Sequence, residues 1–343
     1  MPSAPLLIVG QGLAGTLLAW RCEQAGLDFT IVDAGHAAAA SRVGAGIVNP
    51  LTGRRIVKSW QVDAWREEAL ATYRELEAAL GVPLLRPMRV RRFFRDAAER
   101  AVFEEKAARG DLAPYTSERL ADAAGFWIDG AAHVDTGRLI AAARARWLAV
   151  GRLREARIDP GEERMPASGR VTVVCGGAAC REAFDFVPWE LARGQLLTVR
   201  LTESVACEVI LNCGHWALPL PDGDVRIGAT YERGAADLTA TPAARAELER
   251  SAAKLLGRPF AVVAHETGLR ATTPDRRPVA GWHPQIAGLG VLGGLASKGA
   301  LWAPALARQW LDHVQTGAPF LPAADVARFV RRPPDLPDAS SRL

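Results

Sequence analysis

Three glycines near the start of the chain have the spacing of a loop that holds a diphosphate. Gly10-x-Gly12-x-x-Gly15 follows the apolar run 6–9 and opens a segment with helical spacing of apolar residues. Gly10 permits a tight turn, Gly12 lets a pyrophosphate approach the backbone at a helix N-terminus, and Gly15 permits close packing of helix on strand. A second strand ends at Asp33, 18 residues after Gly15, where the carboxylate would accept hydrogen bonds from ribose hydroxyls and repel a 2′-phosphate. The sequence therefore predicts a βαβ unit that binds a dinucleotide other than NADP.

Two other interpretations of such glycines were weighed. A Gly-rich turn without a ligand would have the same spacing, although the complete strand–helix–strand context favours a dinucleotide. A second match, Gly288-x-Gly290-x-x-Gly293 with Asp312 beyond it, leaves too little chain for another βαβ unit. We interpret it as a strand and a loop, so the sequence indicates one dinucleotide site.

Four further segments are rich in small residues. Small side chains let a flat ring lie against the backbone, and a loop that leads into a helix offers N–H groups to an anion. The segments are 41–50 (SRVGAGIVNP), 171–177 (VTVVCGG), 268–281 (GLRATTPDRRPVAG) and 293–299 (GGLASKG). The first of them would, without a ligand, be only a flexible loop.

Hydrophobic periodicity divides the chain into a mixture of helices and strands. The predicted helices are 62–80, 96–108, 135–150, 242–256 and 299–315; the predicted strands are 86–95, 171–174, 194–201, 206–211, 216–230, 261–267 and 288–293; and 268–281 is predicted as a loop. Both ends of the chain have α/β character, and the middle has antiparallel-looking strands. We therefore predict an α/β fold (α+β overall) in which a nucleotide-binding domain is interrupted by a second domain.

The composition is that of an ordinary globular protein in a reducing compartment. The 343 residues are 49% hydrophobic and 23% charged, which suits about two domains and argues against disorder, collagen and coiled coil. Five cysteines without a C-x-x-C predict neither a disulfide framework nor a metal site, and His215, His265 and His283 lack ligand spacing. The N-terminus has no basic leader region, and no apolar run reaches about 18 residues. We therefore expect a cytoplasmic protein with no membrane partner.

The basic character of the chain comes from arginine. The net charge is +4, with 42 basic and 38 acidic residues. Only four of the basic residues are lysines, Lys58, Lys106, Lys254 and Lys298, so the other 38 are arginines. Arginine is the better bidentate clamp for anions. Because the excess is small and spread over the chain, it does not by itself indicate a nucleic-acid partner.

The glycine-rich segments, in this order, resemble the D-amino-acid oxidase / glycine oxidase / sarcosine oxidase family (DAO family) of FAD-dependent oxidoreductases. The stretch 268–281 is similar to the family's GLRPxTPDxxPxxG, and GGLASKGALWAPALA (293–307) is similar to its C-terminal flavin loop and helix. The resemblance covers nearly the whole chain. It implies a Rossmann-like FAD-binding domain (1–84, 129–186 and 261–331), interrupted by a substrate domain with an antiparallel sheet (85–128 and 187–260), and a flexible tail (332–343).

By this resemblance the cofactor is FAD. Covalent-flavin relatives carry a cysteine in the stretch that matches 268–275, and none is present, so we expect FAD to bind non-covalently. The residues that the resemblance places around the cofactor are Gly10, Gly12, Leu13, Ala14, Gly15, Asp33, Ala34, Ser41, Arg42, Ala45, Gly46, Ile47, Gly176, Gly177, Arg270, Gly294, Ala296, Ser297, Lys298 and Gly299.

The same resemblance implies three catalytic residues. Arg270 matches the arginine that pairs with the substrate carboxylate, although an ion pair with an acid such as Asp275 would explain it structurally. Trp216 falls where related oxidases carry a pocket tyrosine, and a core tryptophan is the alternative. Lys298 lies in the flavin-covering loop, next to Ser297, where glycine oxidases have a second arginine.

Two further departures from the family pattern concern single residues. The proline that usually follows the carboxylate-binding arginine is Ala271 here. Arg226 falls where sarcosine oxidases carry a lysine facing the flavin, and we interpret it as an arginine on a solvated strand face.

The resemblance implies an enzyme that oxidises a C–N bond of an amino acid or N-substituted amine. The substrate's α-hydrogen would leave as hydride to flavin N5, the imine would be hydrolysed, and oxygen or another electron acceptor would reoxidise the flavin. A first alternative is an FAD-dependent oxidase of a tRNA wobble-uridine side chain, because the chain is similar to the FAD domain of the bifunctional enzyme that modifies that base. In that case phosphate would meet Arg86, Arg89, Arg91, Arg92 and Arg95, although a solvated strand face is favoured. A second alternative is a flavin-binding protein with little turnover.

Overall fold

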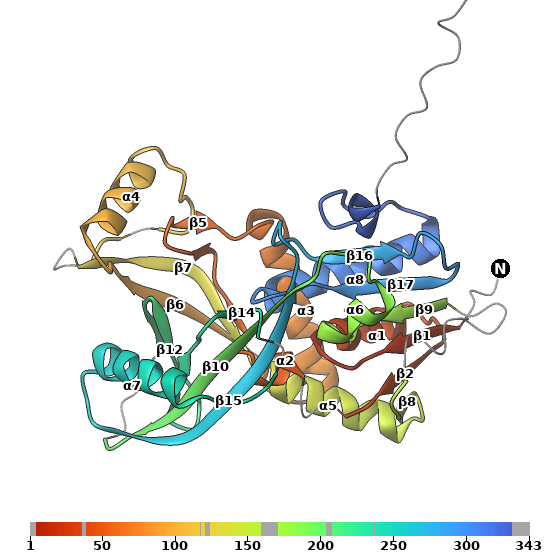
Figure 1. Cartoon of the computed structure of the whole chain (residues 1–343), viewed down its shortest axis with the longest axis horizontal. Helices are drawn as coiled ribbons and strands as arrows, with labels where there is room; N and C mark the ends of the chain where they lie inside the picture. Colours follow the sequence, from red (N-terminus) through yellow and green to blue (C-terminus); the bar gives the residue numbers. More distant parts are fainter. Residues whose placement is uncertain are drawn as a thin grey trace, which may run out of the picture.

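The computed structural model describes residues 5–35, 39–116, 118–120, 124–158, 171–203, 208–235 and 237–330. Cys207 and the predicted flexible tail at 332–343 lie outside these residues. Two sheets organise the chain, and Figure 1 shows them side by side, with strands β10 and β15 reaching from one toward the other.

The smaller sheet has six strands and contains the predicted dinucleotide unit. Its order is β16-β17-β9-β1-β2-β8, and all neighbours are parallel except β16 and β17. The strands are β1 (Leu6–Val9), β2 (Phe29–Asp33), β8 (Leu153–Glu155), β9 (Val171–Val174), β16 (Val279–Trp282) and β17 (Leu289–Gly293). Ligands of open parallel sheets bind where the chain order reverses, at the carboxyl ends of the strands. In this sheet the chain order reverses between β1 and β9, which are neighbours in the sheet although they lie far apart in the sequence.

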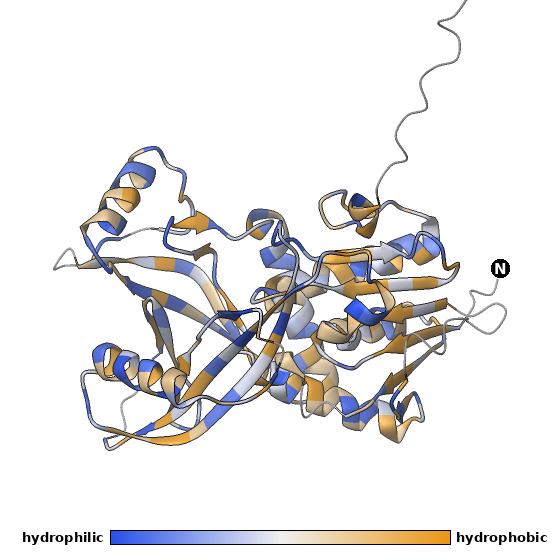
Figure 2. Ribbon diagram, in the orientation of Figure 1, coloured by the Kyte–Doolittle hydropathy of each residue, from blue (hydrophilic) through white to orange (hydrophobic). Residues whose placement is uncertain are grey.

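Both faces of this sheet are covered, as expected for parallel strands that are apolar throughout. One large cluster of buried side chains joins α1, α3, α5 and α8 to the sheet, and a second joins β9, β16 and β17 to residues 180–187 and 326. Figure 2 shows the hydrophobic colouring of these strands. The helices are α1 (Leu13–Gln24), α2 (Ala40–Val43), α3 (Val62–Leu80), α4 (Ala97–Ala108), α5 (Thr136–Ala149), α6 (Cys180–Ala183), α7 (Pro242–Leu256) and α8 (Gly299–Thr316), with short 3-10 turns η2 (Gly177–Ala179) and η3 (Val326–Phe329).

The larger sheet has nine strands and is mostly antiparallel. Its order is β14-β10-β13-β12-β11-β6-β7-β3, and β15 pairs with β10. The strands are β3 (Ile47–Val48), β6 (Leu85–Phe93), β7 (Gly125–Val134), β10 (Glu190–Leu201), β11 (Val209–Cys213), β12 (His215–Pro219), β13 (Asp224–Gly228), β14 (Glu232–Arg233) and β15 (Phe260–Thr272); a separate hairpin joins β4 (Leu51–Thr52) to β5 (Val57–Lys58). Only β6 and β11 run parallel.

The mixed α/β fold class predicted from the sequence is confirmed, while some elements differ. Residues 268–272, predicted as part of a loop, continue β15, which pairs with β10 from Phe260 to Thr272. Residues 279–281, at the end of the same predicted loop, belong to β16. Strand β7 was not predicted. The second glycine match, 288–293, is a strand, as interpreted above. The boundaries of the two domains stay a prediction.

None of the helices in the described ranges combines the length and the apolar character that a membrane crossing requires.

Glycine at position 290 serves packing, and its replacement should destabilise the fold. A Cβ at Gly290 would lie 2.3 Å from a ring carbon of Trp310, which is fully buried. We expect Gly290→Ala to lower the free energy of unfolding by about 1–3 kcal/mol, as overpacking does. Urea unfolding followed by tryptophan fluorescence measures the change.

The matched control is Gly137→Ala in the first turn of α5. Its Cβ would meet no atom closer than 3.6 Å, so the variant should be neutral or slightly more stable. Equal stabilities of the two variants would contradict the packing role of Gly290.

Candidate active site

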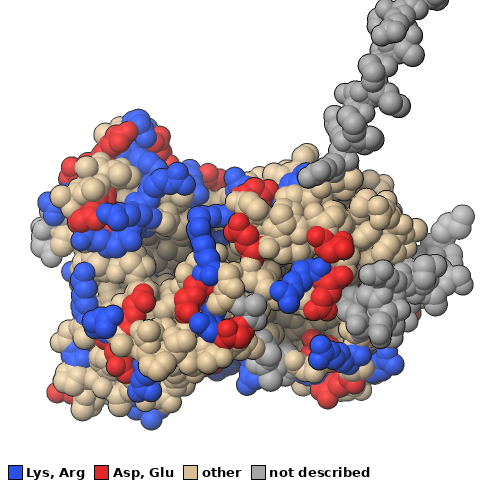
Figure 3. All heavy atoms as spheres, viewed as in Figure 1, with Lys and Arg blue, Asp and Glu red and all other residues tan. Residues whose placement is uncertain are grey.

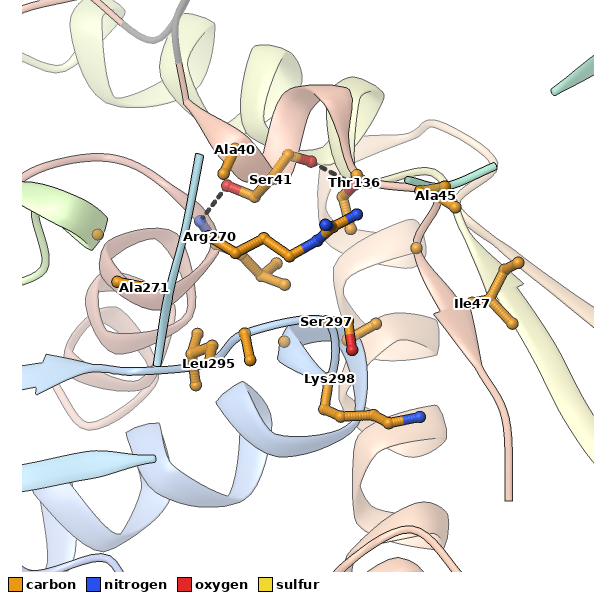
Figure 4. A pocket seen from close by; sticks show the side chains of 18 of the residues that line it. Ala40, Ser41, Ala45, Ile47, Thr136, Arg270, Ala271, Leu295, Ser297 and Lys298 are labelled. Carbon is orange, nitrogen blue, oxygen red and sulfur yellow. Dashed lines mark hydrogen bonds between the residues drawn. The ribbon is translucent and has the colours of Figure 1, made fainter. Parts of the chain in front are cut away.

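A cavity lies where the two sheets meet, at the carboxyl ends of β1 and β9. Its volume is about 810 Å³, within the range of sites for large cofactors. Figure 4 shows side chains from α2, β15 and the loop before α8 converging on it. The predicted site residues that line it are Gly10, Gly12, Leu13, Ala14, Asp33, Ser41, Ala45, Gly46, Ile47, Gly176, Gly177, Trp216, Arg270, Gly294, Ala296, Ser297, Lys298 and Gly299.

Three predicted residues do not line the cavity. Gly15 packs behind the first loop, where a Cβ would lie 1.9 Å from the carbonyl oxygen of Gly10. Ala34 and Arg42 have exposed side chains outside the cavity. The predicted contacts of these three with a cofactor are therefore not supported by geometry, although the packing role given to Gly15 agrees with its position.

The residues around the β1–α1 loop form a cradle for a diphosphate. Gly10 has φ +99°, and a Cβ there would lie 2.9 Å from the carbonyl oxygen of Cys175, so only glycine fits where β1 meets β9. Gly12 caps α1 without a side-chain hydrogen bond, and Lys298 does the same for α8. Two helix N-termini, at which the cap residue itself makes no side-chain hydrogen bond, thus face one cavity, which suits an anion.

Asp33 lines the cavity with its carboxylate already held in place. It accepts hydrogen bonds from the backbone N–H of Gln11 (2.7 Å) and Gly35 (2.9 Å) and from Arg144 (3.1 Å). Arg144 is buried and also bonds Gln11 and Glu155. The carboxylate is therefore fixed at the end of β2, at the position that the sequence assigns to a ribose contact.

The loop after β2 is tied to two other segments. The hydroxyl of Ser41 accepts the N–H of Leu13 (3.0 Å), and its carbonyl accepts the hydroxyl of Thr136 (2.6 Å), as Figure 4 shows. Arg226 donates to the carbonyls of Val43 (2.7 Å) and Gly44 (3.3 Å) and pairs with Glu266 (3.0 Å). The interpretation of Arg226 as a solvated strand-face residue is therefore wrong, because it anchors this loop to the larger sheet.

Arg270 points into the cavity without a carboxylate partner among the described residues. Its one hydrogen bond goes to the carbonyl of Thr230 (3.1 Å), and its guanidinium lies 5.5 Å from the ring centroid of Tyr231. Burial lowers its pKa. Asp275, the alternative partner considered from the sequence, pairs instead with Arg328 (2.9 Å). The structural explanation of Arg270 is thus removed.

Lys298 and Trp216 also line the cavity. The amino group of Lys298 has no hydrogen bond in the described part of the chain, and burial lowers its pKa to about 8. The ring of Trp216, on β12, packs over Gly228, where a Cβ would lie 2.6 Å from a ring carbon. Whether either residue takes part in chemistry stays a prediction.

Sequence reasoning did not place one wall of the cavity, although it named Arg92 and Arg95 as possible phosphate contacts and Asn49 as part of the segment 41–50. This wall consists of side chains from β6, β11, the β4 region and the segments after β6 and β13, and their positions depend on strand pairing. These residues are Asn49, Leu51, Thr52, Arg54, Val90, Arg92, Arg95, Ile210, Asn212, Thr230, Tyr231 and Leu238. Over the described residues no cluster of three His, Cys, Asp or Glu side chains is placed to hold a metal ion.

The fold and the cavity define a dinucleotide-binding protein with a second, antiparallel sheet over its ligand. Residues 6–311 match the family described as FAD dependent oxidoreductase (DAO). The chain belongs to this family, and its cofactor is FAD. The glycine cradle, the two helix N-termini and the size of the cavity fit this cofactor.

Relatives with curated names fall into two groups. The chain is 28% identical to a glycine oxidase of Pseudomonas aeruginosa over 95% of this chain and 98% of that protein. It is 32% identical to the Pseudomonas putida glycine oxidase over 41% of this chain and 39% of that protein. It is 29% identical to the tRNA 5-methylaminomethyl-2-thiouridine biosynthesis bifunctional protein MnmC of Maricaulis maris over 92% of this chain, and spans about half (53%) of that protein.

Solved structures share the fold. Glycine oxidase from Geobacillus kaustophilus superposes with a TM-score of 0.74 at 20% identity, covering 95% of this chain and 98% of that one. Iminodiacetate oxidase from Chelativorans sp. BNC1 gives 0.73 at 21% identity, covering 92% and 96%.

Lys298 should make FAD binding depend on pH. Its charged form would attract the anionic cofactor, and a bound anion raises its pKa, so the charge and the attraction are lost as the pH rises above about 8. We expect the FAD dissociation constant of the cofactor-free protein to rise about fivefold between roughly pH 7 and 9.5, which corresponds to about 1 kcal/mol. Fluorescence titration with FAD measures it.

The comparison uses the Lys298→Met variant. Its affinity for FAD should be weaker than that of the unmodified protein and nearly independent of pH over the same pH interval. Lys254→Met, on the exposed side of α7, should behave as the unmodified protein. The same pH dependence in Lys298→Met would exclude Lys298 as its origin.

Proposed function

We propose that this protein oxidises a C–N bond of an amino acid or an N-substituted amine, with FAD as the electron acceptor. The observation that carries the proposal is the unpaired guanidinium of Arg270 in the FAD cavity. A guanidinium removed from water without a counter-charge is costly, and a carboxylate from the substrate would supply two charge-assisted hydrogen bonds.

The position of Arg270 depends on its neighbour across the strands. A Cβ at Gly194 would lie 2.1–2.2 Å from the guanidinium atoms of Arg270, so the glycine leaves open the space that the guanidinium occupies. The carbonyl of Thr230 orients the group by a hydrogen bond (3.1 Å). These contacts fix the guanidinium before a substrate arrives, which lowers the entropy lost on binding.

The chain's own residues bind and orient the substrate. When bound, FAD would supply the two-electron acceptor for the hydride from the substrate's α-carbon, and the amine nitrogen would lose a proton. The resulting imine takes up water and yields a carbonyl compound and an amine or ammonia. Arg270 holds the carboxylate so that the α-carbon keeps one position, and Trp216 contributes an apolar wall. Oxygen or another acceptor then removes the two electrons.

The resemblance to glycine oxidases over nearly the full length of both chains supports this function. A second candidate is oxidation of a tRNA wobble-uridine side chain, which the 29% identity to MnmC favours. Against it, the chain spans only about half of that protein, and Arg89 of the segment 86–95 is engaged by Asp129. We therefore favour a small-molecule substrate.

The direct test is anaerobic reduction of the flavin. The purified protein should be yellow from FAD that is released by denaturation, since no covalent bond is expected. Glycine, sarcosine and other N-alkyl glycines are added without oxygen, and bleaching near 450 nm reports the electron transfer. If the protein holds FAD and none of a broad panel of amines bleaches it, the proposed function is wrong and the flavin-binding protein without turnover remains.

Loss or displacement of Arg270 should weaken substrate binding. With Arg270→Met we expect the substrate concentration for half-maximal flavin reduction to rise roughly 10- to 100-fold, the effect of losing hydrogen bonds to a charged group. Gly194→Ala keeps the charge but pushes away the flexible end of the side chain, so a similar rise is expected with the fold intact. Stopped-flow reduction measures both.

The matched control is Arg245→Met on α7, which removes one guanidinium outside the cavity and should change nothing. If Arg270→Met reduces as readily as the control, Arg270 does not hold the substrate.

A further inference from the structure

The wall of the cavity that the sequence did not place carries a second group of arginines. Strands β6 and β11 run side by side with Val90 opposite Ile210 and Arg92 opposite Asn212, and all four line the cavity. The wall therefore changes along β6 from apolar to polar. Arg95, two residues after the end of β6, continues the polar part.

Arg92 is buried with most of its donors unused. Its side chain is 6% exposed, and its hydrogen bonds, to Glu99 and to the carbonyl of Gly53, both leave from Nη2. Nε is buried and has no partner. Within the described residues Nη1 has none either. A buried guanidinium with free donors beside a cavity is an incomplete binding group.

Arg95 shares the single carboxylate that serves Arg92. Its Nε and its backbone N–H donate to Glu99 (3.0 and 2.9 Å), while both Nη atoms have no hydrogen bond to described residues. Each oxygen of Glu99 is thereby engaged by one of the two arginines. Arg54, at the same end of the cavity, is neutralised by Asp96. Two guanidiniums against one carboxylate leave one positive charge without an ion-pair partner in the described part of the chain.

The lining of the whole cavity also carries an excess of positive charge. Its lining contains five basic side chains and one acidic side chain, and that acid, Asp33, is bonded to Arg144. FAD would bring a diphosphate, which the glycine cradle at the N-terminus of α1 would hold, and a substrate carboxylate would meet Arg270. The pair Arg92 and Arg95 remains without an anion. Figure 3 shows basic side chains gathered beside a hollow on the part of the molecule that carries α4.

We propose that Arg92 and Arg95 form a second anion subsite, so that the preferred substrate is a small amine with two acidic groups. One acidic group would bind Arg270 and the other, a carboxylate or a phosphate, would bind the Arg92–Arg95 pair with Asn212 beside it. The substrate class rests on the proposed function. The subsite itself does not, because a dianion that is not oxidised should bind there as well.

The test compares glutarate with valerate, two five-carbon acids that differ in the second carboxylate. Binding to the FAD-loaded protein is followed by the change in flavin absorbance, which requires no turnover. We expect glutarate to bind roughly tenfold more tightly than valerate, and the preference to weaken in 0.5 M salt. In Arg95→Gln the ratio of the two affinities should fall toward one. The protein should still fold, because Glu99 keeps Arg92 and the backbone N–H of Arg95 as partners.

The matched control is Arg100→Gln, which removes a guanidinium from the exposed side of α4 outside the cavity and should keep the preference for glutarate. A parallel titration with 4-phosphonobutyrate shows which second acidic group the subsite prefers, a carboxylate or a phosphate-like group, because the preferred one binds more tightly. Equal binding of glutarate and valerate, or an unchanged ratio in Arg95→Gln, would overturn the subsite. The subsite would also be overturned if glutarate and valerate failed to displace each other from the protein. If glutarate is preferred but no amine reduces the flavin, the subsite stands and the proposed function fails.

Discussion

The parallel pairing of β1 with β9 is the contact on which the rest of the site depends. It joins residues 6–9 to residues 171–174, which are separated in the sequence by strands β3, β6 and β7 of the larger sheet. At its carboxyl end the backbone of Gly10 lies so close to Cys175 that no side chain fits between them. That closeness brings the N-terminus of α1 to the edge of the sheet, where it lines the cavity. Without the pairing of β1 with β9 there would be no cradle for a diphosphate. The loops that follow these two strands would then not meet at one cavity.

The larger sheet depends on this junction and completes it. Strand β15 pairs with β10 over its whole length and carries Arg270 near its end, next to the small sheet. Arg226, from β13, holds the loop at Val43 and Gly44 by its backbone carbonyls. Backbone carbonyls are present whatever side chains the loop carries. This anchor therefore fixes the path of the loop independently of its side chains. The two sheets thus share one rigid boundary, and the cavity lies along it.

The sequence predicted what depends on local spacing. The glycine fingerprint, the helices 62–80 and 242–256 and the loop before α8 are visible because their signals lie within about 20 residues. The continuation of β15 through Thr272 was missed because its stability comes from hydrogen bonds to β10, more than 60 residues away in sequence. For the same reason the sequence offers Arg92 and Arg95 only as possible phosphate contacts on an arginine-rich strand, with a solvated strand face favoured. Their common carboxylate, Glu99, and their exposure to the cavity follow from how β6 pairs and where α4 begins.

Unused donors are also a means of selection. A cavity that is lined by guanidiniums and lacks free carboxylates pays a desolvation cost that only an anion removes, so neutral amines of the same shape gain little by entering. Discrimination against a substrate that leaves a buried polar group unpaired is much stronger than discrimination by one methylene group. Arg270 would therefore select for a carboxylate beside the amine, and Arg92 with Arg95 for a second acid further along. The scarcity of lysine fits this design, because the flat guanidinium can keep some donors on protein carbonyls and carboxylates while it presents others to a ligand.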